Sequence, residues 1–133
     1  MISKAALLLF RDHNGEKELL FARAKGKSFL VFPGGKQEAS ETIDQALQRE
    51  LQEELGTSAV NVEKLGTVVG RTPDGRDLEM HLYTGQLLNE PHPHSEIEEI
   101  IWISRAGVAE KSEVMTPMTL DHVMPFLAEY NIW

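Results

Sequence analysis

Four glutamates follow a Gly-Gly pair at short, fixed distances in the first half of the chain: Glu41, Glu50, Glu53 and Glu54. On a helix, residues at i, i+3 and i+4 share a face, so the last three would bring their carboxylates together. Like charges at this spacing destabilise a helix unless a cation lies between them. Hard cations such as Mg²⁺ take oxygen ligands and often bridge carboxylates to substrate phosphates. The spacing therefore predicts a divalent metal and a chemistry on phosphate groups.

These residues belong to a longer pattern, G-x5-E-x7-R-E-U-x-E-E-x-G-U, in which U is a bulky aliphatic residue. The pattern runs from Gly35 to Thr57, and every fixed letter is matched. Only Thr57 departs from it, at the final aliphatic position, where we expect an effect on local packing and not on chemistry. The pattern resembles the motif of the Nudix (MutT-like) hydrolases. Its many fixed positions make this resemblance specific.

The resemblance implies a role for each matched residue. The divalent metal, Mg²⁺ or Mn²⁺, would be held close to the backbone of Gly35 by Glu50, Glu53 and Glu54. Glu41 and Arg49 would brace the loop-helix-loop, and Arg49 can also pair with Glu53 one helical turn away. The metal would neutralise a diphosphate and acidify bound water, whose proton a carboxylate would accept. Glu53 is our first choice for this base, in a catalytic set that consists of Glu53, Glu50, Arg49 and Glu41.

Residues outside the motif could add to this site. Family members differ in the source of the base, and the stretch S-E-I-E-E-I-I-W-I resembles a segment frequent among them. This favours Glu96 or Glu99 as an extra base or ligand, with an acidic strand edge as the alternative reading. Arg23 and Lys36 lie near the Gly-Gly pair and could bind substrate phosphate, although exposed lysines usually serve only solubility.

A helix must carry the acids, and the sequence predicts where it begins and ends. Thr42-Ile43-Asp44-Gln45 has the form of a capping box, and Gly56 is a natural stop. The apolar stripe of this helix recurs every four residues and consists of Ile43, Leu47, Leu51 and Leu55. The carboxylates would lie beside that stripe, at the rim of the core.

Periodicity and turn residues predict the other elements. We expect strands at 4–10, 18–23, 60–69, 78–86 and 97–103. Turns are expected at His13-Asn14-Gly15, at Pro33-Gly34-Gly35 and around Pro73. Thr116-Pro117 should open a helix that Pro125 kinks or weakens. The layout resembles the Nudix fold, an α/β arrangement with a mixed sheet between helices (α/β/α), in a single domain spanning 1–133.

The composition excludes several classes of protein. Hydrophobic residues make up 41% of the chain and charged residues 26%, as in ordinary globular proteins. No apolar run is long enough to cross a membrane, and the start reads as a strand rather than a signal peptide. The absence of cysteine gives no sign of secretion, so we expect a cytoplasmic protein. A net charge of −8 argues against a nucleic-acid polymer as partner.

The expected function is metal-dependent hydrolysis of a nucleoside diphosphate linked to another group. A MutT-like nucleoside triphosphate pyrophosphatase, releasing a nucleoside monophosphate and pyrophosphate, is the leading interpretation. The alternative is a hydrolase of ADP-ribose, another dinucleotide or a nucleotide sugar. A Nudix-fold module that binds nucleotides without catalysis is a third reading, against which the intact set of acids argues. A homodimer is compatible with the sequence.

Overall fold

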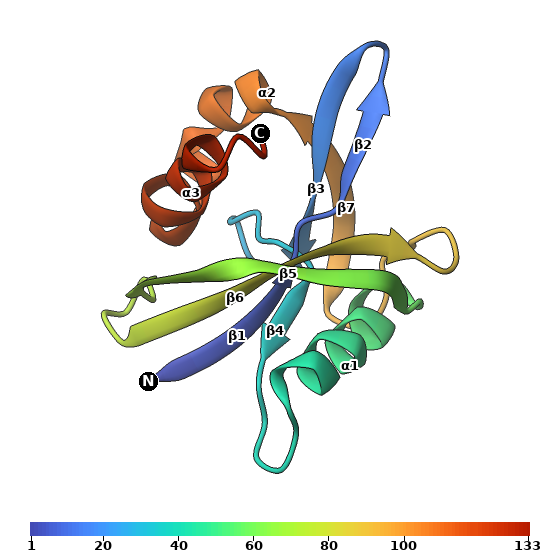
Figure 1. The fold of residues 1–133 in the computed structure, drawn as a ribbon, viewed down its shortest axis with the longest axis vertical. Helices are drawn as coiled ribbons and strands as arrows, with labels where there is room; N and C mark the ends of the chain where they lie inside the picture. Colours follow the sequence, from blue (N-terminus) through green and yellow to red (C-terminus); the bar gives the residue numbers. More distant parts are fainter.

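The computed structural model describes all residues from 1 to 133 as two sheets and several short helices (Figure 1). The strands are β1 (Ile2–Leu7), β2 (Phe10–His13), β3 (Glu16–Ala24), β4 (Gly34–Lys36), β5 (Ala59–Arg71), β6 (Asp77–Leu87) and β7 (Ile97–Ser104). The helical segments are α1 (Ile43–Leu55), α2 (Arg105–Glu110), the 3₁₀ turn η1 (Ser112–Val114), the π-helical turn η2 (Thr119–Val123) and α3 (Met124–Glu129). None of these helices is both long and apolar enough to cross a membrane.

The larger sheet is mixed and lies between helices. Its strand order is β4-β1-β6-β5, with β1 parallel to β6, while the smaller antiparallel sheet has the order β2-β3-β7. Successive residues of a strand face opposite sides. Thus Leu7 packs with the buried stripe of α1, and Ala6 packs in the cluster that contains Leu127 of α3. The helices α1 and α3 lie on opposite sides of this sheet (Figure 1), and the predicted α/β/α arrangement is confirmed.

The prediction of one strand at 4–10 is wrong. The strand β1 ends at Leu7, and β2 begins at Phe10 in the other sheet. Between them, Leu8 N donates to Tyr83 O, whereas Leu9 O accepts from Leu20 N. The two linking leucines therefore pair with different sheets while both stay buried. A continuous apolar run conceals such a change of partner, whereas the other four strands are confirmed with slightly different ends.

The Pro33-Gly34-Gly35 segment also differs from the prediction, because Gly34 and Gly35 belong to the short strand β4 and not to a sharp turn. Gly34 has φ 133°, and a Cβ there would collide with the carbonyl oxygen of Ala5. Glycine thus lets β4 approach β1 closely. The close backbone approach that Gly34 permits is therefore between two strands of the larger sheet.

The C-terminal helix is irregular where Pro125 predicts a disturbance. Helical residues run from Pro117 to Glu129, and Thr119 N donates to Thr116 Oγ1 as at a capped start. Pro125 has no N–H to continue the α-helical ladder. In the preceding turn, η2, Met124 N donates to Thr119 O with π-helical spacing. The predicted effect of the proline is confirmed.

Candidate active site

The helix α1 begins and ends where its capping residues predict. Thr42 Oγ1 accepts from Gln45 N at 3.1 Å, and Gln45 Oε1 accepts from Thr42 N at 2.8 Å, which completes the capping box. At the other end, Gly56 is left-handed with φ 70°, and its N–H donates to Gln52 O. The buried face of α1 consists of Ala46, Leu47, Leu51 and Leu55. Caps and buried face together fix how far along the helix, and in which direction, the acids project.

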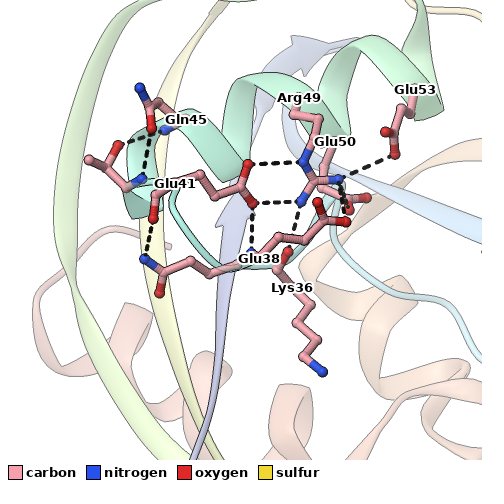
Figure 2. Close-up of polar contacts among 9 residues, drawn as sticks. Lys36, Glu38, Glu41, Gln45, Arg49, Glu50 and Glu53 are labelled. Carbon is pink, nitrogen blue, oxygen red and sulfur yellow. Dashed lines mark hydrogen bonds and ion pairs between the residues drawn. The ribbon is translucent and has the colours of Figure 1, made fainter.

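Arg49 lies at the centre of a charged network that joins α1 to the preceding loop and to β4 (Figure 2). Its guanidinium donates to the two carboxylate oxygens of Glu41 at 2.8 and 3.1 Å and to Lys36 O at 2.9 Å. It also donates to Glu50 Oε1 at 2.8 Å and reaches Glu53 Oε2 at 3.5 Å. The Arg49 guanidinium holds the pKa of Glu41 below its usual range. The structure thus contains the Glu41–Arg49 contact expected from the sequence.

Glu54 and Glu50 lie side by side against β4. Gly34 N donates to Glu54 Oε1 at 3.0 Å. Burial, reinforced by the neighbouring charge of Glu50, raises the pKa of Glu54 to about 8, although the hydrogen bond from Gly34 acts in the opposite direction. A Cβ on Gly35 would lie only 2.5 Å from Glu50 Cδ. The Glu50 carboxylate therefore occupies space that a side chain at position 35 would fill.

The three acids predicted to bind metal are not arranged as a complete ligand set. No group of three or more His, Asp or Glu side chains lies at metal-binding distances. Glu53 is turned towards Arg49, with 53% of its side chain exposed. The chemistry of the donors nevertheless fits a hard divalent cation, since all are carboxylate oxygens and two of them belong to half-buried, adjacent acids, Glu50 and Glu54. Glu50, Glu53 and Glu54 are the residues that could hold such an ion.

A cleft of about 460 Å³ opens beside Glu50 and Glu54. Apolar side chains of the larger sheet and of the segment before β4 line it, among them Ala6, Val31, Phe32, Leu78 and Met80. Residues 116–119 form the facing wall, and four cations contribute to the lining: Lys4, Lys36, Arg71 and Arg76. Its size suits a small-molecule ligand. Most of this lining was not predictable from the sequence, because it comes from segments that only the fold brings together.

The remaining predicted site residues lie apart from the cleft, with the exception of Lys36. Arg23 donates to Glu98 at 3.0 Å and to Glu99 at 2.9 Å, along the paired strands β3 and β7. The side chain of Glu96 is exposed, and its backbone oxygen accepts from a neighbouring loop. Arg23, Glu96 and Glu99 do not line the cleft, and their roles stay predictions.

A proline-rich loop closes the C-terminal end of α1. His92 N donates to Leu55 O at 3.2 Å, and His94 N donates to Glu54 O at 2.9 Å. The prolines before each histidine have no N–H, so the available donors alternate along the loop. Carbonyl groups at a helix end otherwise lack partners. The loop therefore holds the turn that carries the acids, a role that sequence analysis did not assign to it.

Thr57, the one departure from the motif, is buried, with 1% of its surface exposed. Its hydroxyl oxygen accepts from Asn89 N at 3.0 Å. Thr57 thus occupies the aliphatic position of the motif and also hydrogen-bonds to Asn89, in the segment that follows β6. The expected effect on local packing agrees with this buried environment.

The chain is similar to known proteins in sequence and in fold. Residues 1–120 match the NUDIX domain family. A stretch of 65 residues is 53% identical to an 8-oxo-dGTP diphosphatase of Haemophilus influenzae and covers 47% of each protein. A second such diphosphatase, of Proteus vulgaris, is 52% identical over 46 residues, which are 35% of this chain and 41% of the relative. The matched stretches thus span less than half of these relatives.

Similarity to a solved structure extends over most of the chain. The solution structure of the E. coli ORF135 protein aligns with a TM-score of 0.72 and 28% identity, covering 96% of this chain and 89% of the other. Family match, fold and the geometry around α1 point the same way: the chain belongs to the NUDIX domain family.

Proposed function

We propose that the protein hydrolyses a nucleoside triphosphate to a nucleoside monophosphate and pyrophosphate, with an oxidised purine nucleotide such as 8-oxo-dGTP as the preferred substrate. The observation that carries this proposal is the cleft, in which an acid pair, a basic rim and an apolar floor adjoin. The acid pair and the basic rim suit a triphosphate with its metal, and the apolar floor suits a nucleobase. The diphosphatases of Haemophilus influenzae and Proteus vulgaris, more than half identical over the matched stretches, support the choice of substrate.

In this proposal the carboxylates of α1 hold one or more divalent ions. Glu50, Glu53 and Glu54 bind Mg²⁺ or Mn²⁺, and Gly35 leaves room beside them. When bound, the metal supplies charge neutralisation at the diphosphate and a more acidic water. Glu53 is the most exposed of the three, and it accepts the proton of the attacking water. Glu96 or Glu99 is the alternative base.

Positively charged groups orient the phosphates. Arg49, with Glu41, keeps the acids of α1 in place relative to β4. Lys36 lies in the lining of the cleft next to the acids, where its ammonium group can reach a phosphate. Arg23 reaches a phosphate only by leaving its glutamate partners on β7. The nucleobase packs on the apolar floor, against Phe32 and Met80.

Release of nucleoside monophosphate from a panel of nucleotides tests the proposal, with pyrophosphate as the second product when the substrate is a triphosphate. The panel contains the normal and oxidised deoxynucleoside triphosphates, ADP-ribose, NADH and dinucleoside polyphosphates, each with Mg²⁺, Mn²⁺ or EDTA. We expect metal-dependent release of pyrophosphate, fastest from an oxidised purine triphosphate. Tight binding of a nucleotide without turnover in either metal would refute an enzyme and support a binding module.

A second candidate function has one observation in its favour. Pro73 lines the cleft, and a proline near this distance from the motif marks ADP-ribose hydrolases in the family. In this chain the offset is one residue longer, and Pro73 also serves the turn between β5 and β6. Turnover of ADP-ribose ahead of all triphosphates would decide for this alternative.

The proposed setting is the cytoplasm, with a nucleotide as partner and the chain as a monomer or homodimer. The chain contains no cysteine and so no disulfide that would point to secretion. Sedimentation at micromolar concentration, with and without nucleotide, distinguishes the two oligomeric states.

A further inference from the structure

Two glycines of β5 make room for the C-terminal helix. Gly66 and Gly70 lie on the same face of the strand. A Cβ on Gly66 would lie 2.7 Å from Phe126 Cζ, and one on Gly70 would lie 2.7 Å from His122 Cδ2. His122 and Phe126 are four residues apart and occupy one face of the helix. The helix can lie this close to β5 only because both positions lack a side chain.

The two glycines differ in their distance from the cleft. Gly70 directly precedes residues 71–73, which line the cleft on the sheet side. A Cβ on Gly70 would also lie 3.2 Å from Cε of Met118, which lines the cleft on the helix side. Gly66 meets only Phe126, and neither residue lines the cleft. Gly70 thus adjoins both walls of the cleft, and Gly66 adjoins neither.

The cleft wall at 116–119 is connected to the residues that meet Gly70. Thr116 Oγ1 donates to Thr119 Oγ1 at 3.1 Å and accepts from Thr119 N at 3.2 Å, which ties the wall into one unit. The π-helical turn η2 starts at Thr119 and contains His122. His122 therefore lies three residues from Thr119, in the turn that continues the wall.

We propose that Gly70 and His122 are positioning residues that set the width of the cleft and thereby its affinity for the nucleotide. The inference rests on the proposed nucleotide hydrolysis. A methyl group at position 70 displaces the His122 ring and the Met118 terminal methyl away from β5. Because Met118 lines the cleft, this displacement moves the wall relative to the floor formed by β6. The acids of α1 lie at another part of the cleft and keep their geometry.

Four variants test this inference: Gly70→Ala, Gly66→Ala, His122→Ala and the double variant Gly70→Ala/His122→Ala. We expect Gly70→Ala to raise KM for the best nucleotide about tenfold with kcat within about twofold, because a small misplacement of the binding wall weakens binding and spares the chemistry. The matched control Gly66→Ala should lower the melting temperature comparably and leave KM within about twofold. Removal of the His122 ring should restore KM in the double variant to within about threefold of the wild-type value.

Calorimetric titration with the nucleoside monophosphate keeps this inference separate from the proposed function. If the wild-type protein turns over no nucleotide, hydrolysis is refuted, while weaker binding by Gly70→Ala than by Gly66→Ala still supports the inference. Equal KM or equal binding in these two variants overturns it. Should Gly70→Ala not fold, His122→Trp enlarges the same contact from the helix side, and an unchanged KM in that variant overturns the inference as well.

Discussion

Two arginines of this protein, Arg49 and Arg23, bind glutamates at similar distances and keep the same exposed fraction of side chain, 25%. Their partners differ. Glu41 and Glu50, the closest partners of Arg49, are only 15% and 17% exposed. The partners of Arg23 are adjacent residues of β7 that are 53% and 49% exposed.

The difference shows that a pair of short ionic contacts does not define a role. The partners of Arg49 belong to the loop, to α1 itself and to the backbone of β4, so the guanidinium connects three segments. Loss of Arg49 would leave half-buried carboxylates without a partner, which is costly. The contacts of Arg23 lie in solvent, where ion pairs contribute little and are screened by salt. Arg49 is suited to hold geometry, and Arg23 is suited to exchange its partners for an anionic ligand.

The largest expected effect is on kcat. It distinguishes an acid that contacts Arg49 from an acid that contacts Arg23. We expect Glu53→Gln to lower kcat by roughly 10²–10⁴, because it removes a carboxylate proposed as base and metal ligand. The matched control Glu98→Gln, which changes an acid of similar exposure next to Arg23, should keep kcat within about twofold. Steady-state rates with Mg²⁺ and circular dichroism of both variants provide the measurement. Equal losses in the two would break the distinction between the networks.

The next effect concerns stability. Arg49→Met should lower the free energy of unfolding by about 1–2 kcal/mol, because it leaves Glu41 and Glu50 without their donor. Arg23→Met should leave the melting temperature close to that of the wild type, because its partners remain hydrated. Urea unfolding of the metal-free variants measures both changes. A loss for Arg23→Met as large as that for Arg49→Met would show that the exposed network also holds the fold.

A third prediction uses pH and compares Glu41 with Glu54. Burial raises the pKa of Glu54 to about 8, so its contribution to stability is full below the usual value of 4.5 and is lost as pH rises through about 8. The lowered pKa of Glu41 has the opposite sign, giving stability above 4.5 that is lost as pH falls through the folded value. Without metal, we expect the wild-type protein to lose stability between about pH 5 and pH 8.5.

Two substitutions show which residue causes the pH dependence of stability on each side. Glu54→Gln should remove the loss of stability at alkaline pH, while Glu41→Gln should remove only the loss at acid pH. Thermal unfolding at intervals of pH measures both. A Glu54→Gln variant with the wild-type slope would exclude Glu54 as the acid responsible for the loss of stability at alkaline pH.

The smallest effect tests the proposed exchange at Arg23. Arg23→Gln should raise KM for a triphosphate about fivefold at low salt, the loss expected for one charge-assisted hydrogen bond. The effect should shrink at higher ionic strength. Arg11→Gln is the control, because Arg11 forms a comparable surface pair with Glu18 at 2.8 Å on the β2–β3 hairpin. Equal KM values in the two variants would remove Arg23 from the phosphate site.

The helix and its acids could be predicted because the groups that determine them are neighbours in the sequence. The capping box spans four residues, and the contact between Glu41 and Arg49 needs only a helix that starts at the right place. The change of sheet between Leu7 and Phe10 was not predictable in this way, since it depends on which distant strand each backbone group meets. Short α2 carries too few residues for a periodic pattern to develop.

The cleft was the least predictable part of the site. Its wall at 116–119 and its basic lining at Arg71 and Arg76 lie far in the sequence from the acids of α1. The helix that continues this wall packs on two glycines of β5, Gly66 and Gly70, whose role is visible only once the helix covers them. Arg23 shows the converse, because its distance from the motif was short and yet the fold directs it to β7. Closeness in sequence predicts which side chains meet within one helix or strand, but not which ones meet between different elements.

The alternation of proline and histidine after β6 has a consequence for hydrogen exchange. Between positions 91 and 94 only His92 and His94 carry an amide proton, and each is bound to a carbonyl at the end of α1. A deuterium label can therefore enter this stretch of backbone only when the loop detaches from the helix that carries Glu54. The exchange rates of these two protons report how often the acid-bearing turn is released, and nucleotide or Mg²⁺ that orders the turn will slow both together.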